Sequence, residues 1–257
     1  MKKLAIALIF LVGCANNNSV NTALVLEPLQ PLSYQERTTM KEEEYKQLNQ
    51  IIIDFSQSLF EEVLARGEEN PVISPLSLYY ALAMVSLGAR NYTQQEFIDL
   101  LGLHPQDLAP KLNLLQRFIA ETAGETDIRL ANSVWFDEWI YLNESFANRV
   151  EGYFHVTPFS RSFLDLDTIE EINAWVYANT NGLIEEVIEE IDPGTIMFLI
   201  NVIYFFGRWE HIMETSTRNF YLSDGTNVDT TFFHTSFSGA SLRYTVNFLL
   251  SSGFSTL

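Results

Sequence analysis

Residues 193–209 read PGTIMFLINVIYFFGRW, and this stretch decides the fold. Apolar residues follow one another through residues 195–206, which is long enough for a central strand covered on both faces. One amide, Asn201, stands in the middle of the run. A buried polar group left unpaired costs about 1–3 kcal/mol, so we expect Asn201 to have a hydrogen-bond partner inside the protein.

A second segment, NPVISPLS at residues 70–77, predicts the start of a buried helix. Ser74 precedes Pro75, and proline suits the first helical position, so Ser74 is a good N-cap. Ser77 then lies in the first turn of a helix that is apolar nearly all round. Two arrangements are open: these hydroxyls form one buried network with Asn201, or each polar group is satisfied locally.

The apolar spacing elsewhere predicts an α+β domain, because a helix-rich first half is followed by longer strands. A capping box at Thr93–Glu96 is expected to open one of the helices, and Gly102 to end it. We expect helices over 44–65, 75–88, 93–102, 110–122, 143–153, 168–180 and the acidic segment 184–191, and strands or extended segments over 127–136, 155–163, 195–206 and a hairpin at 220–233.

The composition excludes some partners. The formal charge is -18, with 33 acidic residues against 15 Lys and Arg, so nucleic acid and anionic lipid headgroups would be repelled. Nine acids lie between Arg161 and Arg208 with no Lys or Arg among them. This run is interpreted as a solvated helix face; steering of a basic partner is the alternative.

The N-terminus has the organisation of a secretion signal. Lys2 and Lys3 precede an apolar run at residues 4–12, which is too short to span a bilayer. The sequence Leu-Val-Gly-Cys ends at Cys14, the chain's one cysteine, and resembles the bacterial lipoprotein box, in which the cysteine is acylated. We expect a lipid-anchored protein of the bacterial cell envelope that faces the periplasm or exterior; an ordinary signal peptide that happens to contain cysteine is the alternative.

No catalytic motif is present, so an enzyme is not expected. The sequence lacks G-x-S-x-G, S-x-x-K, H-E-x-x-H and G-x-x-x-x-G-K. The four histidines have no metal-ligand spacing, and neither a metal nor another cofactor is expected; they are His104, His155, His211 and His234.

Together these segments resemble the serpin family of conformational protease inhibitors. The resemblance is carried by INAWVYANTNGLIEEV at residues 172–187 and by the residues Asn70, Ser74, Pro75, Ser77, Leu199, Asn201, Tyr204, Phe205, Gly207 and Trp209. It implies the N-terminal part of the serpin fold, with helices A–F, strands of sheet A and part of sheets B and C. It also implies a polar shutter beneath sheet A, made of Asn70, Ser74, Ser77 and Asn201, and places Trp209 at the breach, where a loop first enters the sheet.

The resemblance implies inhibition of a serine or cysteine endopeptidase, of unknown identity, as a suicide substrate. Nothing in the sequence resembles the reactive-centre loop or the C-terminal strands, so we expect this form to be inactive. We divide the chain into a signal peptide (1–13), a tether (14–40), a partial serpin domain (41–234) and an aberrant tail (235–257).

Two further hypotheses are a non-inhibitory surface binding lipoprotein and a surface hydrolase. The missing catalytic motifs disfavour the hydrolase. The strand at 195–206 is expected to have an open edge, which would favour aggregation or strand-mediated self-association.

The anchor hypothesis gives a direct prediction. Cys14→Ser removes the thiol that would be acylated, so incorporation of labelled fatty acid should fall to background and the protein should leave the membrane fraction. Acyl chains anchor by burying hydrocarbon, at about 0.8 kcal/mol per CH₂. Cys14→Ser protein that still carries label would exclude Cys14 as the acylated residue.

Overall fold

The computed structural model describes residues 5–14, 42–67, 71, 73–122, 127–156, 158–206, 214–222, 224–238 and 243–249. The chain forms two compact units, residues 1–206 and residues 207–257. Among the described residues of both units, no helix is long and apolar enough to cross a membrane. Each unit is described separately below.

The first unit combines one mixed sheet with helices, as the α+β prediction requires. Its strands are β1 (Ala5–Cys14), β2 (Asp127–Asp137), β3 (Pro158–Arg161) and β4 (Thr195–Phe206). Its helices are α2 (Glu42–Ala65), α3 (Pro75–Ser86), α4 (Asn91–Leu101), α5 (Pro105–Thr122), α6 (Glu144–Phe154) and α7 (Leu166–Asn179).

The described strands of this sheet follow the order β1-β4-β2-β3. β4 and β2 are antiparallel, and their register places Asn201 opposite Asn132. β3 runs parallel to β2, and β1 runs parallel to β4. The apolar run at 195–206 is therefore an interior strand, as the sequence predicts.

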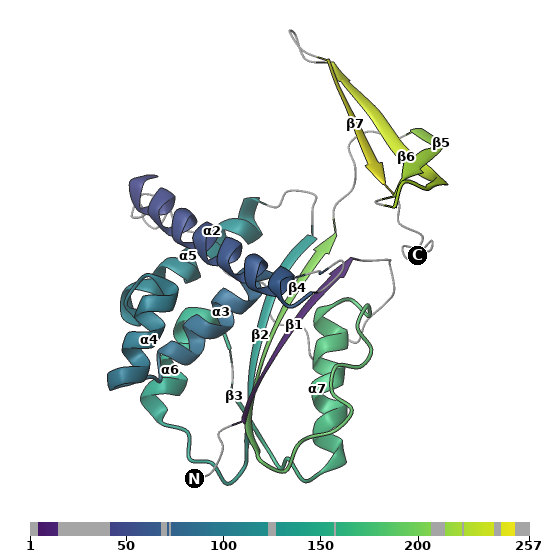
Figure 1. Cartoon of the computed structure of the whole chain (residues 1–257). Coiled ribbons are helices and arrows are strands. Elements are labelled where there is room, and N and C mark those ends of the chain that lie inside the picture. The colour runs from purple at the N-terminus through teal and green to yellow at the C-terminus, as the bar shows by residue number, and fades with distance from the viewer. Residues whose placement is uncertain are drawn as a thin grey trace. The chain divides into compact units, whose positions relative to one another are not determined.

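The sheet lies between two helical layers (Figure 1). On one face, Val134 and Leu199 pack into a core with residues from α2–α6, including Tyr80. On the other face, Trp135 and Ile200 pack into a second core with residues of α7, including Trp175. Alternate residues of β2 and β4 thus enter opposite cores, as the two-residue period of a strand requires.

The ends of α4 separate a correct prediction from a wrong one. Gly102 has φ 74° and caps the C-terminus of α4, as predicted, because glycine adopts this left-handed conformation without steric cost. The capping box at Thr93–Glu96 is wrong. The helix already begins at Asn91, its N-cap is Arg90, and the cap makes no side-chain hydrogen bond.

The acidic segment after α7 is a loop, and the prediction of a helix over 184–191 is wrong. Ile184, Val187 and Ile191 still pack against the second core, which contains residues of α7, so the apolar spacing correctly indicated burial. The loop is held by the Asn173 side chain, whose Oδ1 accepts from the backbone N of Val187 at 2.9 Å and of Ile188 at 3.1 Å. A side chain that bonds the loop backbone replaces the hydrogen bonds a helix would supply.

The outer edge of β4 is not open, contrary to the expectation from the sequence. Residues 5–14, which comprise most of the predicted signal peptide and Cys14, pair with β4 as strand β1. Of the predicted tether, residues 14–40, only Cys14 belongs to the described residues. The open-edge prediction failed because the period of an apolar run cannot tell a signal peptide from a buried strand.

The described residues of the second unit form an antiparallel sheet. Its strands are β5 (Glu214–Tyr221), β6 (Asn227–Ser238) and β7 (Arg243–Leu249). β5 and β6 form the predicted hairpin, and Gly225 has φ 83° in its turn. β7 falls within residues 235–257, which were predicted to be an aberrant tail. It pairs with β6 from Ser238 opposite Arg243 to Phe232 opposite Leu249.

Candidate functional site

The N-terminus of α3 contributes the first polar pair of the candidate site. Ser74 is the N-cap, and its Oγ accepts a hydrogen bond from the backbone N of Ser77 at 3.4 Å. The two hydroxyls are 2.8 Å apart and bonded to each other. Ser77 is fully buried, so this pair satisfies polar groups that would otherwise be stranded at the helix end.

The sheet contributes the second polar pair, one amide from each of two neighbouring strands. Nδ2 of Asn201 on β4 donates to Oδ1 of Asn132 on β2, and the two atoms are 2.5 Å apart. The exposed fraction is 0% for Asn201 and 1% for Asn132. Asn201 has the parity of Leu199, so both amides lie on the face that α3 covers.

This amide pair is only half satisfied. Among the residues that the structure describes, neither Nδ2 of Asn132 nor Oδ1 of Asn201 has a hydrogen-bond partner. One is a donor and the other an acceptor, so a single hydroxyl, imidazole or water could serve both. Among the described residues, the middle of the sheet therefore holds one buried donor and one buried acceptor without a partner.

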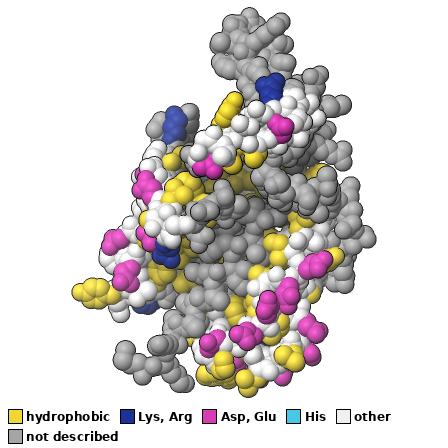
Figure 2. Space-filling model, turned by 45° about the vertical axis from the view of Figure 1, so that its right-hand side comes forward, with side chains coloured by type: hydrophobic (Ala, Val, Ile, Leu, Met, Phe, Trp, Pro, Cys, Tyr) yellow, Lys and Arg dark blue, Asp and Glu magenta, His cyan; other side chains and the backbone are white. Residues whose placement is uncertain are grey.

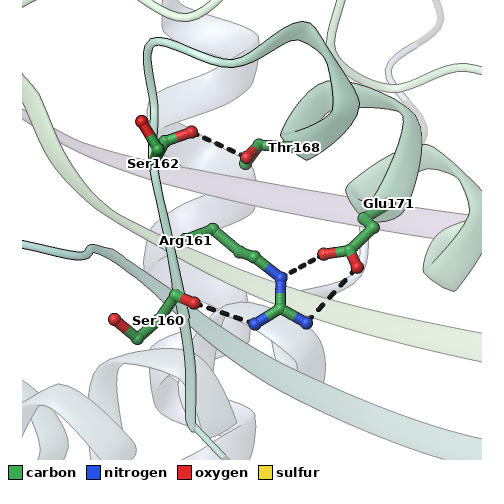
Figure 3. Close-up of polar contacts among 5 residues, drawn as sticks. All are labelled: Ser160, Arg161, Ser162, Thr168 and Glu171. Atoms are coloured by element: carbon green, nitrogen blue, oxygen red, sulfur yellow. Dashed lines mark hydrogen bonds and ion pairs between the residues drawn. The ribbon is translucent and has the colours of Figure 1, made fainter.

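The opposite face of the sheet is closed by α7, which is bonded to Arg161 of β3 and to Ser162, the residue that follows β3 (Figure 3). Arg161 on β3 forms an ion pair with Glu171 on α7. Thr168 Oγ1 donates to the carbonyl oxygen of Ser162 at 2.7 Å. The Arg161 guanidinium also lies 5.8 Å from the ring centre of Phe159, which stacks on Trp135.

The electrostatics of this face are dominated by acids. Asp and Glu side chains gather over α7 and the loop that follows it (Figure 2). They come from the acidic segments 165–171 and 185–192. No group of three or more His, Cys, Asp or Glu that could hold a metal occurs among the described residues.

Comparison with known proteins decides the family. Residues 50–248 match the family model described as "Serpin (serine protease inhibitor)". The chain belongs to the serpin family. This confirms the resemblance drawn from the sequence, and the solved serpin structures that align with the chain confirm the fold class.

Serpins with different roles are similar to this chain. It is 28% identical over 186 residues to corticosteroid-binding globulin of Ovis aries, covering 68% of this chain and 43% of that protein. It is 30% identical over 185 residues to a serine protease inhibitor of Mus musculus, covering 68% of this chain and 42% of that protein. The solved structure of the thermophilic serpin tengpin in its latent state is 30% identical, with a TM-score of 0.58, covering 66% of this chain and 47% of that one. The chain thus spans less than half the length of these relatives.

The described residues of the predicted serpin shutter, Ser74, Ser77 and Asn201, belong to two separate hydrogen-bonded pairs. Ser74 bonds Ser77, and Asn201 bonds Asn132, both pairs lying on the side of the sheet that faces α3. In the described part of the chain, no hydrogen bond joins one pair to the other. Asn70 and Trp209 lie outside the described residues, so the shutter and breach assignments stay predictions.

Sequence reasoning missed Asn132. The signal was available, because Asn132 interrupts the strand 127–136 at the parity of Leu130 and Val134. An amide in an apolar stripe needs a partner, and a second such amide in another strand is the natural candidate.

The amide pair gives a stability prediction. Asn201→Leu should lower the free energy of unfolding by about 1–3 kcal/mol, because it leaves the buried Asn132 amide wholly unpaired. Asn132→Leu/Asn201→Leu should recover most of this loss, since it removes every unpaired atom. Urea unfolding measures both.

Asn219→Leu, at an exposed position on β5, is the matched control and should be nearly neutral. A double variant no more stable than Asn201→Leu would mean that the two amides do not act as a pair.

Proposed function

We propose that this chain supplies the receiving sheet of a serpin-type inhibitor of serine or cysteine endopeptidases. The inhibitor would act as a suicide substrate: the protease cleaves a loop, which then inserts into the sheet as a new strand. The family description and the mouse protease inhibitor among the relatives support the proposal. The inhibitor itself would perform no enzymatic reaction.

One observation carries the proposal: the outer edge of β4 accepts an added strand. β4 lies between the α3 core and the α7 core, and its outer edge pairs with a segment remote in sequence. A strand that enters there gains backbone hydrogen bonds and apolar burial together, which is the driving force that loop insertion needs. The half-satisfied amide pair lies at the middle of the same strand.

The lipid anchor remains part of the proposal. The sequence at Cys14 supports attachment to a bacterial membrane with the domain outside the cytoplasm. An inhibitor held there would meet proteases of the cell envelope or of the surroundings. Neither nucleic acid nor a cofactor enters the proposed mechanism.

The proposal predicts that inhibition needs a reactive loop joined to this sheet. We expect residues 1–234, fused in frame to the C-terminal part of tengpin, to form an SDS-stable complex with at least one protease of a panel. The panel contains trypsin-like, elastase-like, chymotrypsin-like and papain-like enzymes, and a stoichiometric higher-mass band on a denaturing gel is the readout. Residues 1–257, whose sequence has no match to a reactive loop, should give no such band.

Two results would contradict this function. One is a fusion that melts cooperatively, and is therefore folded, yet is cleaved by the whole panel without a stable complex. The other is a covalent complex with residues 1–257 alone, which would mean that the loop is dispensable.

A second candidate function is binding of a small apolar ligand. An open groove of about 660 Å³ lies beside α2 and is lined by Ile53, Ser56, Gln57, Phe60, Pro71, Ile73 and Pro75. Its wall is mostly apolar with two hydrogen-bonding side chains, a composition typical of sites for such ligands. The relative from Ovis aries is named for binding corticosteroid.

Calorimetric titration with cortisol tests this candidate. Phe60→Asp should weaken binding about tenfold or more, because it places a charge in the groove. Leu64→Asp changes an exposed residue on the same helix outside the groove and should not weaken binding. Absence of binding by the unchanged chain, or equal loss in both variants, would remove the candidate.

A further inference from the structure

The strand that covers the outer edge of β4 comes from the extreme N-terminus. β1 runs parallel to β4 over ten residues, from Ala5 opposite Thr195 to Cys14 opposite Phe205. The register is continuous after one irregularity between Ala5 and Ile6. Nearly two hundred residues of sequence separate the partners, so the pairing is a tertiary contact and not a local hairpin.

The sequence of β1 suits this position. It reads AIALIFLVGC and contains no charged residue, proline or amide. Strands covered on both faces have nearly continuous apolar sequences, whereas a strand with one wet face alternates. α3 lies against β1, on the same face as it lies against β4. A segment selected only for export would need apolarity, but it would not need a register with β4.

The edge itself gives the pairing a physical reason. Without β1, β4 would present a row of unpaired backbone N–H and C=O groups along a run of apolar residues. Such an edge pairs with other chains. A strand from the same chain satisfies these groups without needing a second molecule, at the high effective concentration of an intramolecular contact.

We propose that the outer edge of β4 is a strand-binding site, and that its occupant in the unprocessed chain is the chain's own segment Ala5–Cys14. The pairing of β1 with β4 supports both statements. In the proposed lipoprotein processing, cleavage before Cys14 would remove all of β1 except Cys14 and free the edge for another strand.

The pairing of β1 with β4 leaves the buried amide pair without a further partner among the described residues. The register partner of Asn201 is Phe10, whose side chain carries no hydrogen-bonding group. β1 therefore pairs with the backbone of β4 but supplies no polar side chain for Oδ1 of Asn201 or Nδ2 of Asn132, which have no partner in the part of the chain that the structure describes. A strand with a hydroxyl or imidazole at that register position would bind the same edge and also satisfy the amides.

The single cysteine of the chain makes the register testable. Phe205→Cys, at a half-exposed position, places a thiol opposite Cys14. Neighbouring strands are about 4.8 Å apart, within the range of about 4.4–6.8 Å between Cα atoms that a disulfide bridges. The full chain is made by membrane-free cell-free synthesis, and its intact mass confirms that residues 1–14 are retained.

Mild oxidation should then give an intramolecular disulfide in most Phe205→Cys molecules, seen as a faster monomer band and mapped by mass spectrometry. Tyr141→Cys is the matched control. Tyr141 is exposed and follows the end of β2 that lies farthest from Cys14, so no intramolecular bridge should form.

A second variant tests pairing rather than proximity. Leu8→Pro/Ile9→Pro in the Phe205→Cys chain should abolish the bridge, because adjacent residues point their N–H groups to opposite sides and one of them must face β4. Three outcomes would overturn the inference: no more bridging than in the control, bridges only between two molecules, or bridging that survives the prolines. None of these readouts involves a protease, so their failure leaves the proposed inhibition to be judged separately.

Discussion

Burial of β4 between two helical layers is the constraint on which the rest of the first unit depends. One set of alternate residues enters the core shared with α2–α6, and the other set enters the core shared with α7. A strand enclosed in this way has no water to satisfy its backbone, so both of its edges need partners. β2 serves one edge and β1 the other. Two proposals follow from this requirement: inhibition by loop insertion, and binding of the segment Ala5–Cys14 at the outer edge of β4.

The parts that sequence predicted were those with a local physical cause. The apolar length of residues 195–206 fixed an interior strand, and the Ser74-Pro75 pair fixed the start of α3. Gly102 ended α4 because the left-handed conformation is cheap for glycine. The family followed from these same segments together with the later motif at 172–187, and its match extends over residues 50–248. Local sequence patterns therefore predicted the individual helices and strands, and the family motifs predicted the fold.

The failures have a tertiary cause. The loop at 184–191 has helical apolar spacing, but the side chain of Asn173, from another element, holds its backbone. Asn132, which the sequence analysis did not single out, is the hydrogen-bond partner of Asn201 from the adjacent strand. The outer edge of β4 was expected to be open, but the segment 5–14 pairs with it. In each case the deciding partner is distant in sequence, where periodicity carries no information.

Native-state hydrogen exchange of the β4 amides tests the central claim most directly. N–H groups of successive residues point alternately to β2 and β1, so a strand paired on both sides protects every amide in a row. The account predicts uninterrupted protection over residues 197–205 of the full chain, with slower exchange than in the exposed hairpin of β5 and β6. Protection of every second amide would show an open edge. Exchange as fast as in the hairpin would contradict the claim that β4 is the buried centre of the fold.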